Sequence, residues 1–353
     1  MNEKNMNSKA PLVSVIVPAY NVAGYIGQTI DSIFHQIYCN IEIIIVDDCS
    51  TDGTSEICEE VKNNNKKIKY MRHNTNQGQT ITRNDGLKMA SGDWLMFLDG
   101  DDVLEPHAIT TMVNSVTDNE IDIVFAGYES IDCGEVTEHL ATIEEGIYPR
   151  NGFVNFIFDE MSASVLTCIG SKLYRTSFIK ERKPYTSDTI KTNYDMAFVI
   201  DALIACRKIA YVNRPVYGYI QRDNSITHSY RNNMFRFICD ARKKIPDLFE
   251  ECNCDKQKSI LFQRKQLALI NSALKQEVMF DKGYNSFKEC VNNISSSKEF
   301  DKLDAILSKD KIGIAKKVYI DLVRKKKVMI LYAFYKIQKI EFIIKRKKGG
   351  KNV

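Results

Sequence analysis

A short apolar run that ends in a cluster of carboxylates constrains the fold of this chain most. Residues 94–98 (WLMFL) have the length and composition of a strand that is buried on both faces. Asp99, Asp101 and Asp102 follow at its carboxyl end. Because these charges repel one another, we expect a cation or hydrogen-bond donors beside them. Mg²⁺ or Mn²⁺ carrying a diphosphate is the candidate, and a simple turn before a capped helix is the alternative.

Apolar strands and amphipathic helices alternate along the amino-terminal part of the chain. The pattern predicts strands at 13–17, 41–46, 68–71 and 93–98, with helices at 26–37, 54–64 and 79–90. We expect Pro18 to end the first strand. Strand–helix–strand units build parallel sheets through right-handed crossovers. The sequence therefore predicts an α/β fold with a mostly parallel, Rossmann-like sheet flanked by helices.

In such an open sheet the ligand lies beyond the carboxyl ends of the strands. The loop at 18–20, the pair Asp47 and Asp48, and the acidic turn at 99–102 are all predicted to converge there. Two acidic strand ends in one crevice favour a binding site. The first loop, PAYNVAGYIG, lacks the G-x-G-x-x-G of dinucleotide-binding folds, and no P-loop is present. A phosphoacceptor receiver domain would be much shorter than this chain.

The composition indicates a soluble globular protein with room for a second domain. The chain has 353 residues, of which 44% are hydrophobic and 27% are charged. The amino terminus lacks the apolar core of a signal peptide, and no stretch reaches about 18 uncharged apolar residues. Ten cysteines are scattered without the spacing of a zinc site, which favours reduced thiols. We therefore expect a cytoplasmic protein.

Positive charge is concentrated near the carboxyl end, where residues 311–353 contain 14 basic and 2 acidic residues. One face of a predicted helix, between the basic runs at 324–327 and 345–348, carries Ile330, Phe334, Ile337, Ile340 and Ile344. An amphipathic helix flanked by cations suits an anionic membrane surface. A helix packed on the protein's own core and a helix at the contact of a homo-oligomer are the alternatives. Because no base-reading module is present, we expect no nucleic-acid partner.

Four motifs in the amino-terminal part resemble the family 2 glycosyltransferases with the A-type nucleotide-sugar fold. They span residues 12–115 and read VSVIVPAYNVAGYIGQTIDSIFHQ, EIIIVDDCSTDGT, NQGQTITRNDGL and GDWLMFLDGDDVLEP. The resemblance implies an inverting enzyme that moves a sugar from a nucleotide-sugar, most simply UDP-linked, to a hydroxyl of a glycan or lipid-linked acceptor in cell-surface polysaccharide synthesis. A non-catalytic nucleotide-sugar or membrane-binding subunit and a nucleotidyltransferase are the alternatives.

The resemblance also assigns roles to individual residues. Contacts to the nucleotide-sugar are implied for Pro18, Ala19, Tyr20, Asp47, Asp48, Arg83 and Asp99. Asp101, together with Asp99, would hold Mg²⁺ or Mn²⁺ and the diphosphate. These roles are chemically sound, because a carboxylate can accept the imide N–H of uracil and arginine can grip a phosphate. For Arg83 a helix-surface cation is the alternative, and Asp52 is expected to build a turn or to cap a helix.

The part of the chain beyond residue 115 is predicted to hold the acceptor and the catalytic base. Residues 121–125 form a further strand, and 129–145 form a hairpin or a loop. Helical spacing places Asp195 in the first turn of a buried helix. The resemblance implies that Asp195 is the catalytic base, although Tyr194 stands where the family usually has Glu.

Further cations could contact the diphosphate. The resemblance suggests Arg222, which precedes the segment NSIT at 224–227, and less directly His228. Lys172 and Arg175 could touch phosphate or be solvated surface cations. The predicted organisation has a nucleotide-sugar-binding half at 1–115, an acceptor-binding and catalytic-base half at 116–230, a helical region at 231–310 and a basic amphipathic tail at 311–353. We expect a peripheral location at the inner face of the cell membrane.

Overall fold

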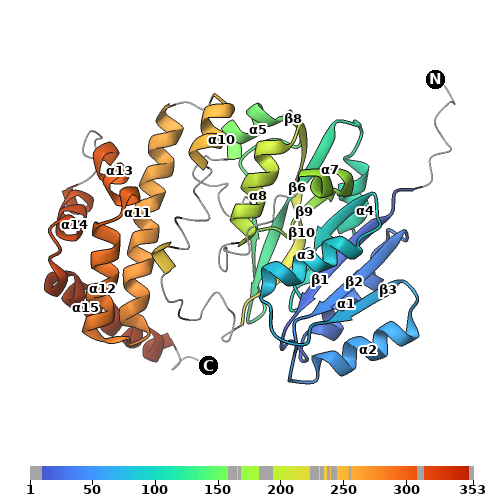
Figure 1. Ribbon diagram of the computed structural model, residues 1–353, viewed down its shortest axis with the longest axis horizontal. Helices are drawn as coiled ribbons and strands as arrows, with labels where there is room; N and C mark the ends of the chain where they lie inside the picture. The colour runs from blue at the N-terminus through green and yellow to red at the C-terminus, as the bar shows by residue number, and fades with distance from the viewer. Residues whose placement is uncertain are drawn as a thin grey trace. The chain divides into compact units, whose positions relative to one another are not determined.

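The computed structural model divides into two compact units (Figure 1). It describes residues 10–157, 165, 168–182, 194–222, 230, 234–236, 239, 245–253, 256–307 and 314–349. The first unit comprises Met1–Asp223 and Lys244–Cys254, and the second comprises Asn224–Lys243 and Asp255–Val353. Each unit has a hydrophobic core of its own. Within the described ranges, no helix combines the length and the apolar character needed to cross a membrane.

A sheet of ten strands forms the centre of the first unit. The strands are β1 (Val13–Ala19), β2 (Ile41–Asp47), β3 (Ile68–Arg72), β4 (Trp94–Phe97), β5 (Val103–Leu104), β6 (Ile121–Asp132), β7 (Glu135–His139), β8 (Gly146–Pro149), β9 (Lys172–Arg175) and β10 (Lys208–Ile220). Their order is β3-β2-β1-β4-β9-β6-β10-β5, and β7 and β8 pair with β6 and β10. The pairs among β3, β2, β1 and β4 are parallel, as is β6 with β10, whereas β9 is antiparallel to both of its neighbours. The predicted α/β sheet is confirmed.

Helices flank this sheet (Figure 1). They are α1 (Ile26–Phe34), α2 (Thr54–Asn64), α3 (Gln79–Met89), α4 (Ala108–Asn114), α5 (Arg150–Ile157), α7 (Thr176–Arg182), α8 (Tyr194–Ala205) and α10 (Ile245–Glu251). Alternate residues of β1 serve the two faces, because successive side chains of a strand point in opposite directions. Val15 belongs to the same core cluster as Ile26 and Ile30 of α1, while Ile16 lies under α3.

The structure contradicts two local predictions, the end of the first strand and the end of the first helix. Pro18 does not end the first strand, because it continues in register with Val46 of β2. Proline lacks only the N–H donor, and the carbonyl of Pro18 still accepts the N–H of Gly100 at 3.2 Å. The helix at 26–37 ends already at Phe34, and the N–H of Ile37 instead donates to the carbonyl of Pro106 at 3.2 Å.

The segment at 129–145 contains a hairpin, one of the two predicted alternatives. β6 continues to Asp132 and pairs with β7 through a turn at Cys133 and Gly134. Both turn residues have positive φ, at 49° and 88°. That combination is typical of a two-residue hairpin turn, and glycine adopts it without strain.

A glycine allows α3 to approach the sheet closely. A Cβ atom on Gly86 would lie 2.4 Å from Cγ2 of Ile16 in β1, so no other residue fits without movement. Arg83 lies one turn earlier on the same face of α3, and its side chain is fully buried. The close contact at Gly86 therefore brings Arg83 down onto the carboxyl end of the sheet.

Glu42 joins several segments through a buried carboxylate near the amino end of β1. It accepts hydrogen bonds from Oγ of Ser14 at 2.6 Å, from N and Oγ of Ser91 at 2.6 and 2.8 Å, and from N of Gly92 at 3.1 Å. Lys69 pairs with it at 2.8 Å. Although burial opposes ionisation, these donors lower the pKa of Glu42 to about 2. The ionised carboxylate thus links β1, β2, β3 and the turn before β4.

This network predicts a pH-dependent loss of stability in the variant Glu42→Gln. Because the folded pKa lies below the unfolded value, ionised Glu42 stabilises the fold above pH 4.5 and loses this effect as the pH falls toward 2. We expect Glu42→Gln to reduce the free energy of unfolding by about 2–3 kcal/mol at pH 7, and by progressively less in acid. Urea unfolding followed by fluorescence of the single tryptophan, Trp94, measures this in the first unit.

Glu60→Gln is the matched control, because Glu60 is exposed on α2. It should leave the urea midpoint unchanged at each pH. A constant difference between Glu42→Gln and the wild type from pH 7 to pH 3 would contradict the role given to the charge of Glu42.

The second unit is helical, so the predicted helical carboxyl-terminal extension is confirmed. Its helices are α11 (Lys256–Met279), α12 (Gly283–Ser295), α13 (Lys298–Leu307), α14 (Ile314–Arg324) and α15 (Val328–Gly349). Apolar residues at helical spacing meet in its core, where Leu274, Phe287, Phe300 and Leu331 are almost fully buried.

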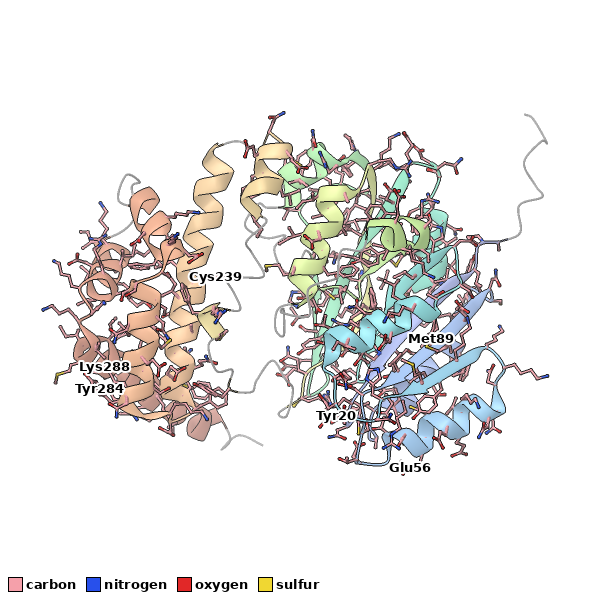
Figure 2. The ribbon with its side chains drawn as sticks, in the orientation of Figure 1. Tyr20, Glu56, Met89, Cys239, Tyr284 and Lys288 are labelled. Carbon is pink, nitrogen blue, oxygen red and sulfur yellow. The ribbon has the colours of Figure 1, made fainter. Side chains whose placement is uncertain are left out.

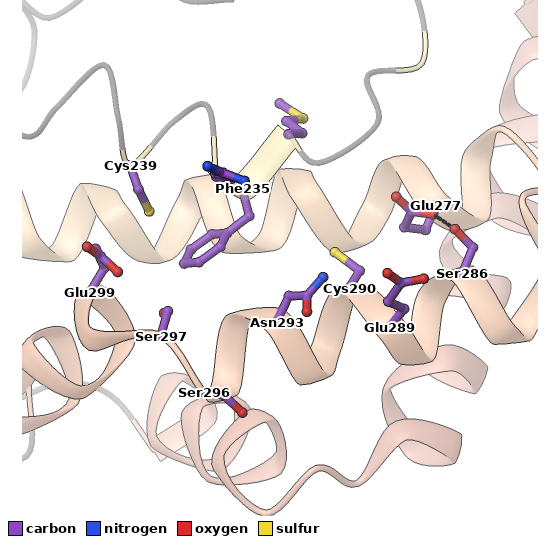
Figure 3. Close-up of a pocket in the computed structure, with 12 residues that line it drawn as sticks. Phe235, Cys239, Glu277, Ser286, Glu289, Cys290, Asn293, Ser296, Ser297 and Glu299 are labelled. Carbon is purple, nitrogen blue, oxygen red and sulfur yellow. Dashed lines mark hydrogen bonds between the residues drawn. The ribbon is translucent and has the colours of Figure 1, made fainter. Parts of the chain in front are cut away.

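A cavity of about 500 Å³ lies inside this helical unit (Figure 3). Phe235, Cys239, Glu277 and Cys290 are among its lining residues, and Ser286 donates a hydrogen bond to Glu277 at 2.6 Å. All lining residues belong to the second unit. The cavity is therefore separate from the strand ends where the sequence predicts the ligand.

Candidate functional site

A buried arginine joins two carboxylates at the carboxyl end of β4. Arg83 donates from Nη2 to Oδ1 of Asp99 at 2.6 Å and from Nη1 to Oδ1 of Asp195 at 2.5 Å. Asp99 follows β4, and Asp195 lies in the first turn of α8. Complete burial of the Arg83 side chain excludes the helix-surface alternative. The structure thus brings together three residues, Arg83, Asp99 and Asp195, that the sequence predicts to lie at the site.

Packing of aromatic side chains holds α8 against the sheet beside the end of β4. Phe198 of α8 meets Phe97 of β4 edge to face, with ring centroids 5.5 Å apart. It meets Tyr174 of β9 in the same way at 5.1 Å. Since Phe97 pairs in register with Ile16, α8 and α3 lie on the same face of the sheet. Their side chains can therefore meet over the end of β4.

The surroundings of Asp195 make it a stronger base than an exposed aspartate. Burial raises the pKa of this carboxyl, the positive charge of Arg83 opposes the rise, and the negative charge of Asp99 adds to it. The Asp195 side chain nevertheless keeps 37% of its surface exposed. A carboxylate that is accessible, oriented by Arg83 and raised in pKa can accept a proton from a bound hydroxyl group.

The two acids at the carboxyl end of β2, Asp47 and Asp48, are buried and hold loops. Asp48 accepts the backbone N–H groups of Gln77 and Gly78, each at 2.7 Å, and contacts Nδ1 of His73 at 2.7 Å. Asp47 accepts from N of Ser50 at 2.9 Å and from its hydroxyl at 2.5 Å. These bonds fix the turn after β2 and the entry to α3.

The loop after β1 has one exposed side chain among its predicted contacts. Pro18 and Ala19 are buried within β1, whereas Tyr20, labelled in Figure 2, is 47% exposed. Asp52 accepts from the N–H and hydroxyl of Thr54 at 3.1 and 2.6 Å and from the N–H of Ala23 at 3.0 Å. Asp52 therefore builds the turn, as expected.

Asp101 forms an ion pair with Arg222, which follows β10. The guanidinium of Arg222 also lies over the ring of Tyr25, 4.5 Å from its centroid. Its Nε is buried and has no hydrogen-bond partner in the described part of the chain. The structure thus places Arg222 beside the acidic turn with one donor unused.

Asp102 is buried, whereas the side chains of Asp99 and Asp101 are partly exposed. Its buried carboxylate accepts a hydrogen bond from the hydroxyl of Tyr217 and another from N of Ile220 at 2.9 Å. Burial raises the pKa of Asp102 to about 8, and the charge of Asp99 contributes to this rise. Asp102 therefore fastens the end of β10 to the acidic turn.

Lys172 and Arg175 of β9 both donate hydrogen bonds to backbone carbonyl groups. Lys172 is fully buried and donates to the carbonyl oxygen atoms of Val165, at 2.8 Å, and Cys168. Arg175 donates to the carbonyl of Ile121 at 3.0 and 2.6 Å. Lys172 is therefore not a surface cation, whereas the Arg175 side chain keeps 24% of its surface exposed. Neither cation is directed to a phosphate by these bonds.

Some predicted features lie outside the described residues. These are the segment NSIT at 224–227, His228 and the side chain of Tyr194.

A family model described as "Glycosyl transferase family 2" matches residues 14–208. The match covers more than half of the chain and includes Arg83, Asp99 and Asp195. The chain belongs to glycosyl transferase family 2. This membership confirms the family that the four motifs predicted.

Curated relatives match this family 2 chain over only part of their own length. The glycosyltransferase GlyA of Streptococcus pneumoniae serotype 4 is 27% identical over 307 residues, which cover 84% of this chain and 43% of GlyA. EpsH of Bacillus subtilis (strain 168) is 31% identical over 232 residues, which cover 64% of this chain and 66% of EpsH. The chain thus spans less than two thirds of the length of either relative.

The fold also has a match among solved structures. S. aureus TarS 1–349, in complex with UDP-GlcNAc, superimposes with a TM-score of 0.68 at 18% sequence identity, covering 94% of this chain and 92% of TarS 1–349. This likeness establishes the A-type fold predicted from the sequence.

The acidic turn of this family 2 chain fits a divalent cation. Side chains of Asp99 and Asp101 are 27% and 19% exposed. Among the described residues, no group of three or more His, Cys, Asp or Glu side chains could enclose a metal ion. Mg²⁺ often binds to one or two carboxylates and takes its other ligands from phosphate oxygens and water. Two carboxylates on one turn suit that arrangement.

Two further residues, His73 and Tyr217, shape the site without being predicted from the sequence. His73 bridges Asp48 and Asp85 through its two ring nitrogens, at 2.7 and 3.1 Å, and Tyr217 binds Asp102. No motif marks His73, which lies just beyond β3. Alternation in the sequence of β10 could have placed Tyr217 inside the sheet, but not against a particular acid.

The bridging geometry of Arg83 predicts a large effect of Arg83→Lys. A lysine ammonium is a compact charge that cannot span Asp99 and Asp195 with a planar fork of donors. We expect the kcat of sugar transfer to fall by about 10²-fold, because Asp195 loses its orientation and part of its charge compensation. Steady-state kinetics with a nucleotide-sugar that the wild type accepts as a donor measures this kcat.

Lys88→Gln provides the control on the same helix, because the Lys88 side chain is 76% exposed. It should retain the wild-type rate. Equal rates for Arg83→Lys and the wild type would show that the bridge between the two acids is dispensable.

Proposed function

We propose that this protein is an inverting glycosyltransferase that moves a sugar from a UDP-linked donor to a hydroxyl of a glycan or lipid-linked acceptor in cell-surface polysaccharide synthesis. One observation carries the proposal. Arg83 joins the candidate base, Asp195, to the first acid of the D-x-D turn, Asp99. A base beside a diphosphate-binding turn is what transfer to a hydroxyl group requires.

The UDP donor is supported by two structures of TarS, which carry UDP-GlcNAc and UDP. In the present chain, Tyr20 would lie against the nucleotide, next to Pro18 and Ala19. Asp47 and Asp48 would contribute contacts to the nucleotide-sugar from the end of the second strand. Asp48 already accepts hydrogen bonds there from the backbone N–H groups of Gln77 and Gly78. Arg83 and Arg222 would provide positive charge near the diphosphate.

Asp195 would perform the proton transfer. An acceptor hydroxyl bound at its exposed oxygen gives up its proton as the oxygen attacks the anomeric carbon, and the bond to the diphosphate breaks. Arg83 keeps the carboxylate oriented and ionised before the attack. The raised pKa favours acceptance of the proton in the transition state.

Negative charge develops on the diphosphate as it leaves. Mg²⁺ or Mn²⁺ held by Asp99 and Asp101 would neutralise part of this charge when bound. Arg222 is suited to help, because its Nε has no hydrogen-bond partner in the described structure and its guanidinium already lies beside Asp101. Asp99, Asp101 and Arg222 would therefore stabilise the leaving diphosphate, whereas Asp195 would accept the proton of the acceptor hydroxyl.

Asp195→Asn should separate donor binding from transfer. The amide cannot accept the proton, so we expect transfer to fall by about 10²–10⁴-fold. Donor binding should persist, measured as the rise in melting temperature with UDP-sugar. Asp31→Asn, an exposed change on α1, should alter neither quantity. Full transfer activity of Asp195→Asn would refute the base assignment.

Metal removal tests the role of the acidic turn. We expect the purified protein to hydrolyse a UDP-sugar slowly in the presence of Mg²⁺ or Mn²⁺. In EDTA the rate of hydrolysis should fall by at least about 10²-fold. Asp101→Asn should weaken Mn²⁺ binding measured by calorimetry. A screen of UDP-, GDP- and CDP-sugars identifies the donor.

The outcomes of this screen decide between functions. Hydrolysis that is equally fast in EDTA would remove the metal from the proposal and leave the transferase. An absence of hydrolysis and transfer with every donor, despite UDP-sugar binding, would favour a non-catalytic binding subunit. We also propose that the enzyme works at the inner face of the cell membrane, where lipid-linked acceptors would be available.

A further inference from the structure

α15 has two apolar faces, and only one of them is covered within the second unit. On the covered face, Leu331 and Tyr335 are 1% exposed. The Tyr335 hydroxyl binds Oδ1 of Asn271 and the hydroxyl of Tyr319, each at 2.8 Å, which fixes the helix on α11 and α14. Lys339 adds a hydrogen bond to the carbonyl of Val278 at 3.2 Å. The orientation of α15 about its axis is therefore well determined.

The other face carries large apolar side chains that the second unit leaves exposed. This α15 strip consists of residues at helical spacing: Met329, Ile330, Phe334, Ile337, Ile340 and Ile344, with exposed fractions from 46% to 75%. A helix that is apolar on all sides is normally buried on all sides. A contiguous apolar surface of this kind commonly marks a contact with another protein or with a membrane.

Charge distinguishes between these two occupants. Four consecutive cations at 324–327 run from the last residue of α14 through the turn before α15, and the sequence KRKK follows the strip at 345–348. Arg324 and Lys325 pair with Asp321, at 3.2 and 2.7 Å, but Lys327 and Lys326 have no acidic partner in the described structure. A second copy would bring two strongly basic surfaces together, whereas anionic headgroups would neutralise them.

We infer that the α15 strip binds the surface of an anionic lipid bilayer, with the helix lying in the plane of the headgroups. The apolar side chains enter the boundary between headgroups and acyl chains, and Lys326 and Lys327 contact lipid phosphates. This inference rests on the proposed function for its setting, since a lipid-linked acceptor lies in the same surface. The residues from which the inference is argued do not include Asp195 or any other residue of the candidate site.

Vesicle flotation with the full chain tests the inference. The probes are vesicles of phosphatidylcholine alone and of phosphatidylcholine with one third phosphatidylglycerol. We expect the wild type to float with the anionic vesicles and to be released by high salt, because the cations contribute to binding. The combined change Ile330→Ser, Phe334→Ser and Ile337→Ser should weaken binding at least about tenfold.

A second variant tests the charge separately. Lys326→Gln with Lys327→Gln should weaken binding to anionic vesicles by about fivefold for each charge removed. The control Val136→Ser with Ile147→Ser removes two side chains of the first unit that are 56% and 43% exposed. The control should bind as the wild type does.

Three results would overturn the inference. They are an absence of wild-type binding to the anionic vesicles, equal binding by the strip variant, and a strip-dependent dimer in analytical ultracentrifugation without vesicle binding. Because the strip residues are exposed, the triple variant should keep its circular dichroism and melting temperature, and the single change Ile337→Ser provides a milder test. UDP-sugar hydrolysis without vesicles tests the proposed function separately, so either can fail alone.

Discussion

The burial of a single guanidinium group organises the candidate site. Arg83 is fully buried, and a buried cation is tolerated only where carboxylates and hydrogen bonds compensate its charge. Asp99 and Asp195 provide this compensation from two segments that are far apart in the sequence. The same bridge that satisfies Arg83 also orients Asp195 and limits the repulsion between the two acids. The hydrogen bonds that compensate the buried charge of Arg83 therefore also assemble the candidate site.

Other acids at the same edge of the sheet have a supporting role. Asp48 holds the turn that leads to α3, and Asp102 holds the end of β10 through Tyr217. Both carboxylates are nearly inaccessible, so their hydrogen bonds contribute to the shape of the crevice. Asp99 and Asp101 differ because part of each side chain remains exposed, which leaves oxygen atoms for a ligand. Burial thus separates acids that look equivalent in the sequence.

The second unit combines a covered core with an uncovered apolar surface. Leu331 and Tyr335 of α15 join the core, while Ile330 and Ile337 remain exposed on the opposite side. The sequence alone could not distinguish a helix packed on its own protein from a helix with a free apolar face. The structure shows that α15 is both, because apolar residues extend around most of its circumference.

The sequence by itself determined the alternation of strands and helices, the family and the position of Asp195 in the first turn of a helix. These features depend on local periodicity and on contiguous motifs, which is why α2 was predicted with its observed limits. The sequence could not reveal that β1 continues through Pro18 or that Lys172 is buried. It also could not reveal that His73 binds Asp48 and that Tyr217 binds Asp102. Only the tertiary structure decided these points, since each depends on which distant residue supplies a hydrogen-bond partner or excludes water. The bridge from Asp99 through Arg83 to Asp195 belongs to the same class, because it exists only when α3 and α8 cover one face of the sheet.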